Sequence, residues 1–210
     1  MNIKKSMYKR NNKLQMYHSD QSLSTTMSDK IISWFPRFPR DYVAVCIGTD
    51  RSTGDSLGPL VGTFFQEYKP KHINIHGTLH NPVHAKNFKK HIQIIHKKYK
   101  NPFIIAIDAS LGRSKSVGLI ISGVGSIKPG AALNKDLPSI GNIYITGVVN
   151  ISGFMEYAIL QNTRLSVVVD MAKNIAKILN IIDQQLTNVQ TPPSILVSNN
   201  YKQQFHQYQS

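Results

Sequence analysis

The sequence predicts an α/β domain in three layers, with a mostly parallel β-sheet and helices on both of its faces. Short apolar, β-branched runs alternate with helix-length amphipathic segments between residues 42 and 186. A chain of 210 residues suits one domain with tails, because one hydrophobic core serves roughly 100 to 200 residues. Strands that alternate with helices in this way form parallel sheets, whose ligands sit at the carboxyl ends of the strands.

Both ends of the chain are predicted to be tails. Residues 1–30 are rich in Asn, Lys, Ser and Gln without a sustained period, so we expect a mobile basic tail. Residues 187–210 are dominated by Gln, Asn, Pro and Ser, which predicts a polar C-terminal tail. Residues 31–186 then form the single domain, on which the apolar side chains of Trp34 and Phe35 should pack.

Within the domain, hydrophobic periodicity predicts the order of the elements. Continuous apolar runs predict buried strands at 42–47, 72–77, 103–107, 117–124 and 142–148. Apolar residues spaced three or four apart predict helices from Asp55 or Ser56 onwards and at 84–99, 153–161 and 165–186. The stretch KPGAALNKDLPSIG at 128–141 contains two Pro and two Gly, which predicts a long irregular loop.

The net charge of +14 is unevenly distributed. Residues 1–40 carry eight Lys or Arg against two Asp, and residues 69–100 carry eight Lys and no acid, so the remainder is neutral. A solvated helix face at 84–99 explains the second cluster better than a nucleic-acid contact, although that contact stays an alternative. No apolar run approaches the ~20 residues that cross a bilayer, so no membrane partner is expected. The lone Cys46 indicates a reducing, cytoplasm-like compartment and a buried thiol.

Two acidic residues follow predicted buried strands. Asp55 lies with Asp50 in the segment GTDRSTGDSLGPLVG, and Asp108 follows four apolar residues in FIIAIDASLG. The strands 42–47 and 103–107 are neighbours in the common doubly wound order, so both carboxyl groups can reach one crevice. Two close carboxyl groups cannot both ionise easily, and such a pair can activate water against an amide. The alternatives are a helix N-cap for Asp55 and a turn cap for Asp108.

Other polar residues near these strand ends are weaker candidates. Asp50, Ser56, Ser110 and Asn150 are placed where they could bind a substrate, although an Asn before a helix is usually a cap. The His residues of the domain all lie between His72 and His96, and we expect a solvated side chain for His80. The sequence therefore predicts neither a metal site nor a cofactor.

The acid loops carry a family resemblance. GTDRSTGDSLGP resembles the first acid loop of the germination protease family, and IDASLG resembles its second. The wider pattern, including SIKPGAALNKDLPSIG and ITGVVNISGFMEY, most closely resembles the DUF1256-like sporulation family YyaC over about residues 30–186. This resemblance implies the phosphorylase/hydrolase-like fold of the hydrogenase maturation proteases, and an atypical aspartic-type catalytic pair in Asp55 and Asp108. The maturation proteases use a further His towards a metal held by their substrate, and this domain has no such His after its later strands.

The resemblance implies a spore-associated peptidase in the cytoplasm of a developing spore or mother cell. Its partner would be a protein or peptide substrate such as a spore protein, and the sequence does not indicate an oligomeric state. One alternative is a sporulation binding protein without catalytic activity. Another is a phosphate- or nucleotide-binding module that uses the Gly-rich first loop at a helix N-terminus. That loop lacks the GxxxxGK[ST] arrangement, and its two Asp would repel an anion.

Overall fold

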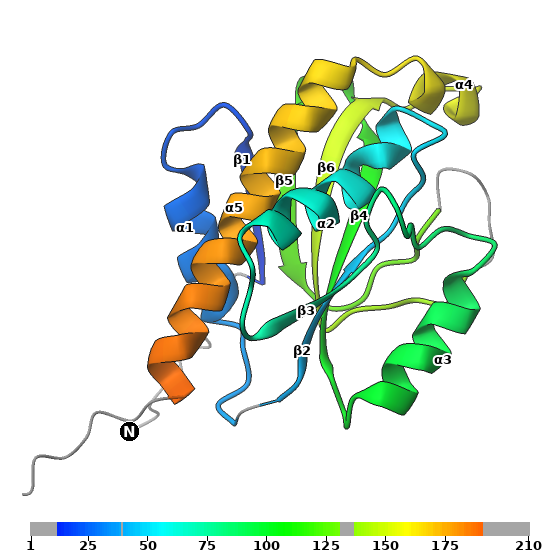
Figure 1. The fold of residues 1–210 in the computed structure, drawn as a ribbon. Coiled ribbons are helices and arrows are strands. Elements are labelled where there is room, and N and C mark those ends of the chain that lie inside the picture. The colour runs from blue at the N-terminus through cyan, green and yellow to red at the C-terminus, as the bar shows by residue number, and fades with distance from the viewer. Residues whose placement is uncertain (1–11, 39, 131–136, 191–210) are drawn as a thin grey trace, which may run out of the picture.

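The computed structural model describes residues 12–38, 40–130 and 137–190, which build a six-stranded sheet. The strands lie in the order β1-β5-β6-β4-β2-β3 (Figure 1). Their bounds are β1 (Lys13–Tyr17), β2 (Tyr42–Cys46), β3 (Ile73–His76), β4 (Phe103–Gly112), β5 (Leu119–Val124) and β6 (Ile143–Ile151). Strands β3, β2, β4 and β6 are parallel, while β5 runs antiparallel to both β6 and β1. The predicted mostly parallel sheet is confirmed.

Helices cover both faces of the sheet, as predicted. They are α1 (Leu23–Ile32), α2 (Leu57–Glu67), α3 (Phe88–Lys98), α4 (Glu156–Gln161) and α5 (Leu165–Gln190), with short 3-10 turns η1 (Gly54–Ser56) and η2 (Ser114–Ser116). Figure 1 shows α1, α2 and α5 side by side over one face, and α3 on the opposite side. None of the helices in the described part of the chain has the length and apolar character needed to cross a membrane.

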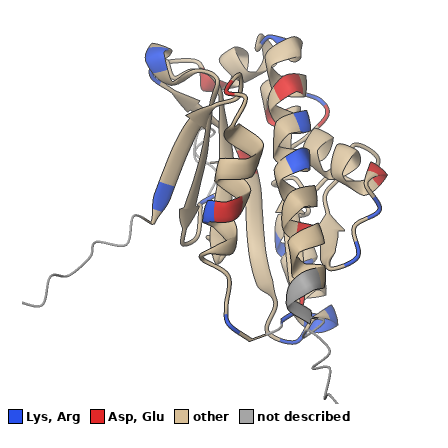
Figure 2. Cartoon of the chain, turned by 90° about the vertical axis from the view of Figure 1, so that its left-hand side faces the viewer, with Lys and Arg blue, Asp and Glu red and all other residues tan. Residues whose placement is uncertain are grey.

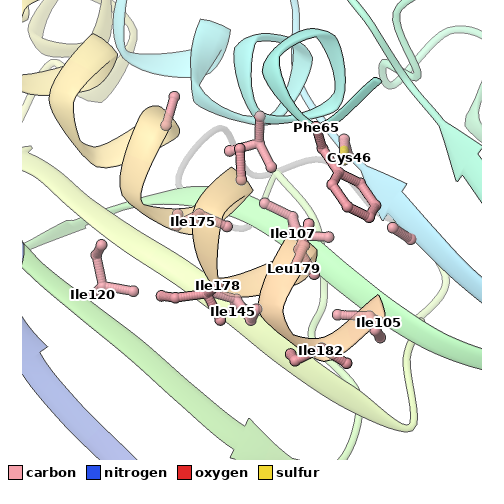
Figure 3. Close-up of a cluster of buried hydrophobic side chains, with 14 of the residues drawn as sticks. Cys46, Phe65, Ile105, Ile107, Ile120, Ile145, Ile175, Ile178, Leu179 and Ile182 are labelled. Carbon is pink, nitrogen blue, oxygen red and sulfur yellow. The ribbon is translucent and has the colours of Figure 1, made fainter. Parts of the chain in front are cut away.

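The core is divided between these two faces because successive side chains of a strand point in opposite directions. On one face, Ile105, Ile107 and Ile145 pack beneath the inner side of α5 (Figure 3). The α5 residues that meet them are Ile175, Ile178, Leu179 and Ile182. On the other face, Ile104 and Ala106 pack against Phe88 and Ile95 of α3. Strands buried on both faces explain the continuous apolar runs.

The predicted mobile tail at 1–30 is wrong over residues 13–30. Strand β1 pairs antiparallel with β5, and α1 buries Leu23, Met27 and Ile31 completely against the core. These three residues recur at a spacing of four, but Ser, Thr and Asp between them hide the apolar stripe in the composition. Strand β1 is an edge strand with alternating exposure, which produces a weak signal. Residues 1–11 lie outside the described part of the chain.

The predicted tail at 187–210 also begins too early. Helix α5 continues to Gln190, one turn beyond the predicted end at residue 186. Residues 191–210 lie outside the described residues, as do residues 131–136 of the predicted irregular loop. The two ends of that loop are held together by a bridge between Ile127 and Ile140. The loop is therefore anchored at the sheet on both sides.

Candidate active site

Asp108 lies inside β4 and not at its end. The strand was predicted to stop at residue 107 but continues to Gly112, and Asp108 is opposite Thr146 of β6. The residues before Asp108 are fully buried, whereas those from Asp108 onwards are partly accessible. The carboxyl group therefore lies where β4 leaves the core while its backbone is still held by a neighbouring strand.

Asp55 lies in η1, between β2 and α2. The loop folds back onto the end of β2, because the N–H of Thr49 donates to the carbonyl of Asp55 at 3.1 Å. Gly48 has a φ of +149°, and a Cβ at that position would collide with the same carbonyl oxygen. The alternative of Asp55 as an N-cap is not observed, since the N-cap position of α2 is Ser56 and makes no side-chain cap bond. A close approach of backbone to backbone thus positions Asp55.

The two acids are coupled electrostatically. Burial raises the pKa of Asp108 to about 7, and the negative charge of Asp55 contributes to the increase. Backbone N–H bonds from Ala109, at 2.9 Å to Oδ1, and from Gly130 act in the opposite direction. Because like charges disfavour a second ionisation, the charge of Asp55 favours the protonated form of Asp108.

The weaker candidates make local bonds. The hydroxyl of Ser56 donates to the Thr53 carbonyl at 2.6 Å, and that of Ser110 donates to the Gly147 carbonyl at 3.2 Å. Asp50 is exposed and accepts a bond from the Thr49 hydroxyl at 3.4 Å. These bonds support the loop and the β4–β6 pair, and a role of these residues in substrate binding stays a prediction.

Asn150 connects β6 to α4. Its Nδ2 donates to the Ile159 carbonyl and to the Thr163 hydroxyl, each at 3.2 Å. Its Oδ1 accepts the N–H of Ile151 at 2.8 Å. The expected N-cap role is wrong, because the bonds reach the far end of α4 and Met155 occupies the N-cap position. Asn150 therefore holds α4 in place beside the acid loop.

Two residues near the acids were missed by the sequence reasoning. Gly130 has a φ of +64° and directs its N–H at Asp108 from the loop that follows β5. Ser52 is 4% exposed, and its hydroxyl has no hydrogen-bond partner among the described residues. The only sequence signals were the resemblance of SIKPG and GTDRSTGDSLGP to family loops, which did not indicate these roles.

Several backbone donors of the first loop already have partners in the chain. The N–H of Gly48 donates to Val83, that of Thr49 to Asp55, and that of Ser56 to Ser52. A phosphate cradle requires such N–H groups to point at the ligand. These three N–H groups therefore do not form such a cradle. In the described part of the chain, no cluster of three or more His, Cys, Asp or Glu could hold a metal, and His80 is exposed.

An apolar surface adjoins the acid loop. The end of β6 and the segment after it expose five large apolar side chains: Ile151, Phe154, Met155, Tyr157 and Leu165. Helix α4 within this segment packs on η1, where a Cβ at Gly54 would meet the Leu160 side chain. Five such side chains within fifteen positions of chain make the segment a candidate contact surface for another polypeptide. We call this segment, residues 151–165, the apolar rim.

The chain is similar to a protein family, to a bacterial protein and to a solved structure. The model of the family "Protein of unknown function (DUF1256)" matches residues 13–178. "Uncharacterized protein YyaC" of Bacillus subtilis (strain 168) is 46% identical over 187 residues, which cover 88% of this chain and 91% of that protein. Among solved structures, the [NiFe] hydrogenase maturation protease HycI from Thermococcus kodakarensis KOD1 is similar with a TM-score of 0.45 and 15% identity. That similarity covers 76% of this chain and 99% of the protease.

Proposed function

We propose that this chain, which belongs to the DUF1256 family, hydrolyses peptide bonds with the Asp55 and Asp108 pair. The observation that carries the proposal is the pKa of Asp108, which burial and the charge of Asp55 raise to about 7. A carboxyl pKa displaced this far beside a second acid is typical of sites that transfer protons. The resemblance of both acid loops to those of the germination protease supports the same chemistry.

The proposed mechanism needs only the two carboxyl groups and water. Ionised Asp55 removes a proton from a water molecule, which then attacks the carbonyl carbon of the scissile amide. Protonated Asp108 donates its proton to the carbonyl oxygen, so that the tetrahedral intermediate forms without a full negative charge. The N–H bonds from Ala109 and Gly130 stabilise the Asp108 carboxylate that remains. Asp55 then gives its proton to the amide nitrogen and Asp108 takes a proton from one hydroxyl of the intermediate, while the C–N bond breaks to release the amine and the carboxylic acid. Both acids return to their starting protonation.

The apolar rim supports a polypeptide as the substrate. It lies next to η1, so a chain that presents its backbone to the acids would also cover exposed apolar side chains such as Phe154. The resemblance to the germination protease and the YyaC family further supports a spore protein as substrate. Such a reaction would take place in the cytoplasm of a developing spore or its mother cell.

A peptide library provides the test. The purified chain is incubated between pH 5 and 8 with tryptic peptides of a spore proteome, and new termini are identified by mass spectrometry. We expect a set of cleavages that Asp55→Asn and Asp108→Asn each reduce at least a hundredfold, because each removes a proton-transfer step. Asp41→Asn serves as the control, since Asp41 is exposed and precedes β2, at the opposite end of that strand from the loop with Asp55.

Two results would contradict the proposal. One is a library that stays intact at every pH with native, folded protein. The other is a set of cleavages that persists in the Asp55→Asn, Asp108→Asn double variant, which would assign the activity to other residues or to a contaminant.

A further inference from the structure

The second site lies at the opposite edge of the sheet from β1. Strand β3 is the last strand of the order β1-β5-β6-β4-β2-β3, and β2 is its hydrogen-bonded neighbour in the sheet (Figure 1). An edge strand carries outward-facing N–H and C=O groups, which another chain can pair with. The direction of each backbone N–H and C=O along β3 determines which of them can bond to another chain.

The register determines these directions. The N–H of Ile47, the residue directly after β2, donates to the carbonyl of Ile107 in β4. Because backbone groups alternate along a strand, the odd-numbered residues of β2 face β4 and the even-numbered ones face β3. Because Asn74 lies opposite Val43, and backbone groups alternate along a strand, Asn74 pairs with β2 and Ile75 faces outwards.

An independent contact agrees with this assignment. The N–H of Ile73 donates to Oδ1 of Asp183 at 2.8 Å and not to β2. Residues two apart share a direction, so the N–H and C=O of Ile75 point away from β2 as well. The carbonyl of Ile73 faces the same way. The edge therefore presents a short ladder centred on Ile75.

A groove of about 570 Å³ follows this ladder. All of β3 lines it, together with Gln66 and Lys69 at the end of α2 on one side and His91 of α3 on the other. Four residues of strand span about 13 Å, which matches a short extended peptide. The groove thus has a hydrogen-bonding floor and side walls from two helices.

Apart from the Asp183 carboxylate at Ile73, the charged side chains of the chain segment that forms the groove are positive. Residues 69–100 contain eight Lys and no Asp or Glu. Burial lowers the pKa of His76, and the charges of His91 and Lys98 lower it further. Burial also lowers the pKa of His91, with contributions from His84 and Lys90. Lysine charge therefore reaches the groove. On the face formed by α5, in contrast, acidic and basic residues are interspersed (Figure 2).

We propose that the β3 edge binds an extended acidic segment of another protein by strand addition. Its backbone would pair with the Ile75 N–H and C=O, and its carboxylates would lie near Lys69, Lys90 and Lys98. A second copy of this chain fits poorly, because two copies of the same lysine-rich edge repel each other. A nucleic acid matches the charge but has no peptide backbone to complete the ladder. The inference does not depend on the acid pair.

Binding is measured by fluorescence anisotropy with the full-length Asp108→Asn variant, so that cleavage does not interfere. The probes are labelled peptides of about ten residues, a typical upper strand length, with alternating Glu and Val or alternating Lys and Val. We expect the acidic probe to bind at least tenfold more tightly than the basic one, and more weakly as salt increases. The acidic probe with N-methylated backbone should lose at least tenfold in affinity.

Variants locate the site. Ile75→Pro removes an outward N–H while the β2 ladder is unaffected, so it should weaken binding at least tenfold, whereas Ile75→Val should not. Reversal of two charges, Lys90→Glu with Lys98→Glu, should also weaken binding, and Lys115→Glu is the exposed control away from the groove. If Ile75→Pro does not fold, the N-methylated probe still tests the backbone pairing, because it removes the hydrogen-bond donors of the peptide.

The inference is overturned by equal binding of the two probes, by no binding of the acidic probe, or by full affinity of the N-methylated probe. It is likewise overturned if the native chain forms dimers in light scattering that Ile75→Val retains and Ile75→Pro lacks, because a second copy then occupies the edge. Equal salt-sensitive binding of duplex DNA and the acidic probe would show a charged surface without strand addition.

Discussion

The carboxyl group of Asp108 should destabilise the folded chain at neutral and alkaline pH. Its pKa is about 7 in the folded chain, compared with an ordinary value of 3.8. Between these values the folded state binds more protons than the unfolded state, so the free energy of unfolding falls as the pH rises. Asp108→Asn removes the ionisable group and should therefore increase stability, with a gain that grows with pH.

The magnitude follows from the two pKa values. Integration of the linkage relation predicts a gain for Asp108→Asn of about 1.5 kcal/mol at pH 5 and about 4 kcal/mol at pH 8. These values are upper limits, because an amide also loses part of the bond that Ala109 donates to Oδ1. A gain of 4 kcal/mol corresponds to a melting temperature roughly 10 °C higher for a chain of this size.

The assay is urea denaturation of the native chain and of Asp108→Asn at pH 5, 6, 7 and 8. Asp55→Asn should reduce the pH dependence without abolishing it, because the charge of Asp55 is the second cause of the raised pKa, after burial. Asp50→Asn should leave the dependence as it is, since that carboxyl group is exposed. An Asp108→Asn variant no more stable than the native chain at pH 8, or a gain that is the same at pH 5, would refute the reasoning.

Three further predictions concern other parts of the molecule. Asp183→Ala should destabilise the chain by about 3 kcal/mol or more, because its buried carboxylate accepts three backbone N–H bonds at the start of β3; Asp170→Ala, exposed on the same helix, should change stability little in the same denaturation assay. Cys46 should resist a thiol reagent in the folded chain and react on unfolding, since burial raises its pKa to about 12; stoichiometric labelling of native protein would contradict this. Phe154→Asp in the apolar rim should raise KM for a cleaved peptide at least fivefold with little change in kcat, and kinetics that show the reverse would place the rim outside the substrate contact.

Local patterns in the sequence were enough for most of the sheet. A strand buried on both faces leaves a continuous apolar run in the sequence, so β2 was predicted to within one residue of its end at Cys46. The same reasoning failed for β1 and α1, which are short and have one side in water, so that polar residues dilute the apolar pattern. It also ended β4 at residue 107, since pairing with β6 and not apolar character carries that strand to Gly112.

The two acids were visible in the sequence as polar residues after buried apolar runs, and the resemblance to a known family predicted Asp55 and Asp108 as a pair. The bonds around them were not visible. Gly130 reaches Asp108 across 22 positions of chain, and Asp183 holds the N–H of Ile73 across 110. Polar contacts between distant residues leave no period in a sequence, because each depends on where two separate elements are packed.

The order of apolar and polar residues by itself determined the class of fold, the main strands and helices, and the positions of two acids near strand exits. Periodicity carries this information because it arises from backbone geometry within each element. Only the tertiary structure decided that Asp108 is desolvated beside Asp55, and that β3 is an open edge among lysines. A pKa and a free strand edge both depend on what surrounds a group in space, and those neighbours come from remote parts of the chain.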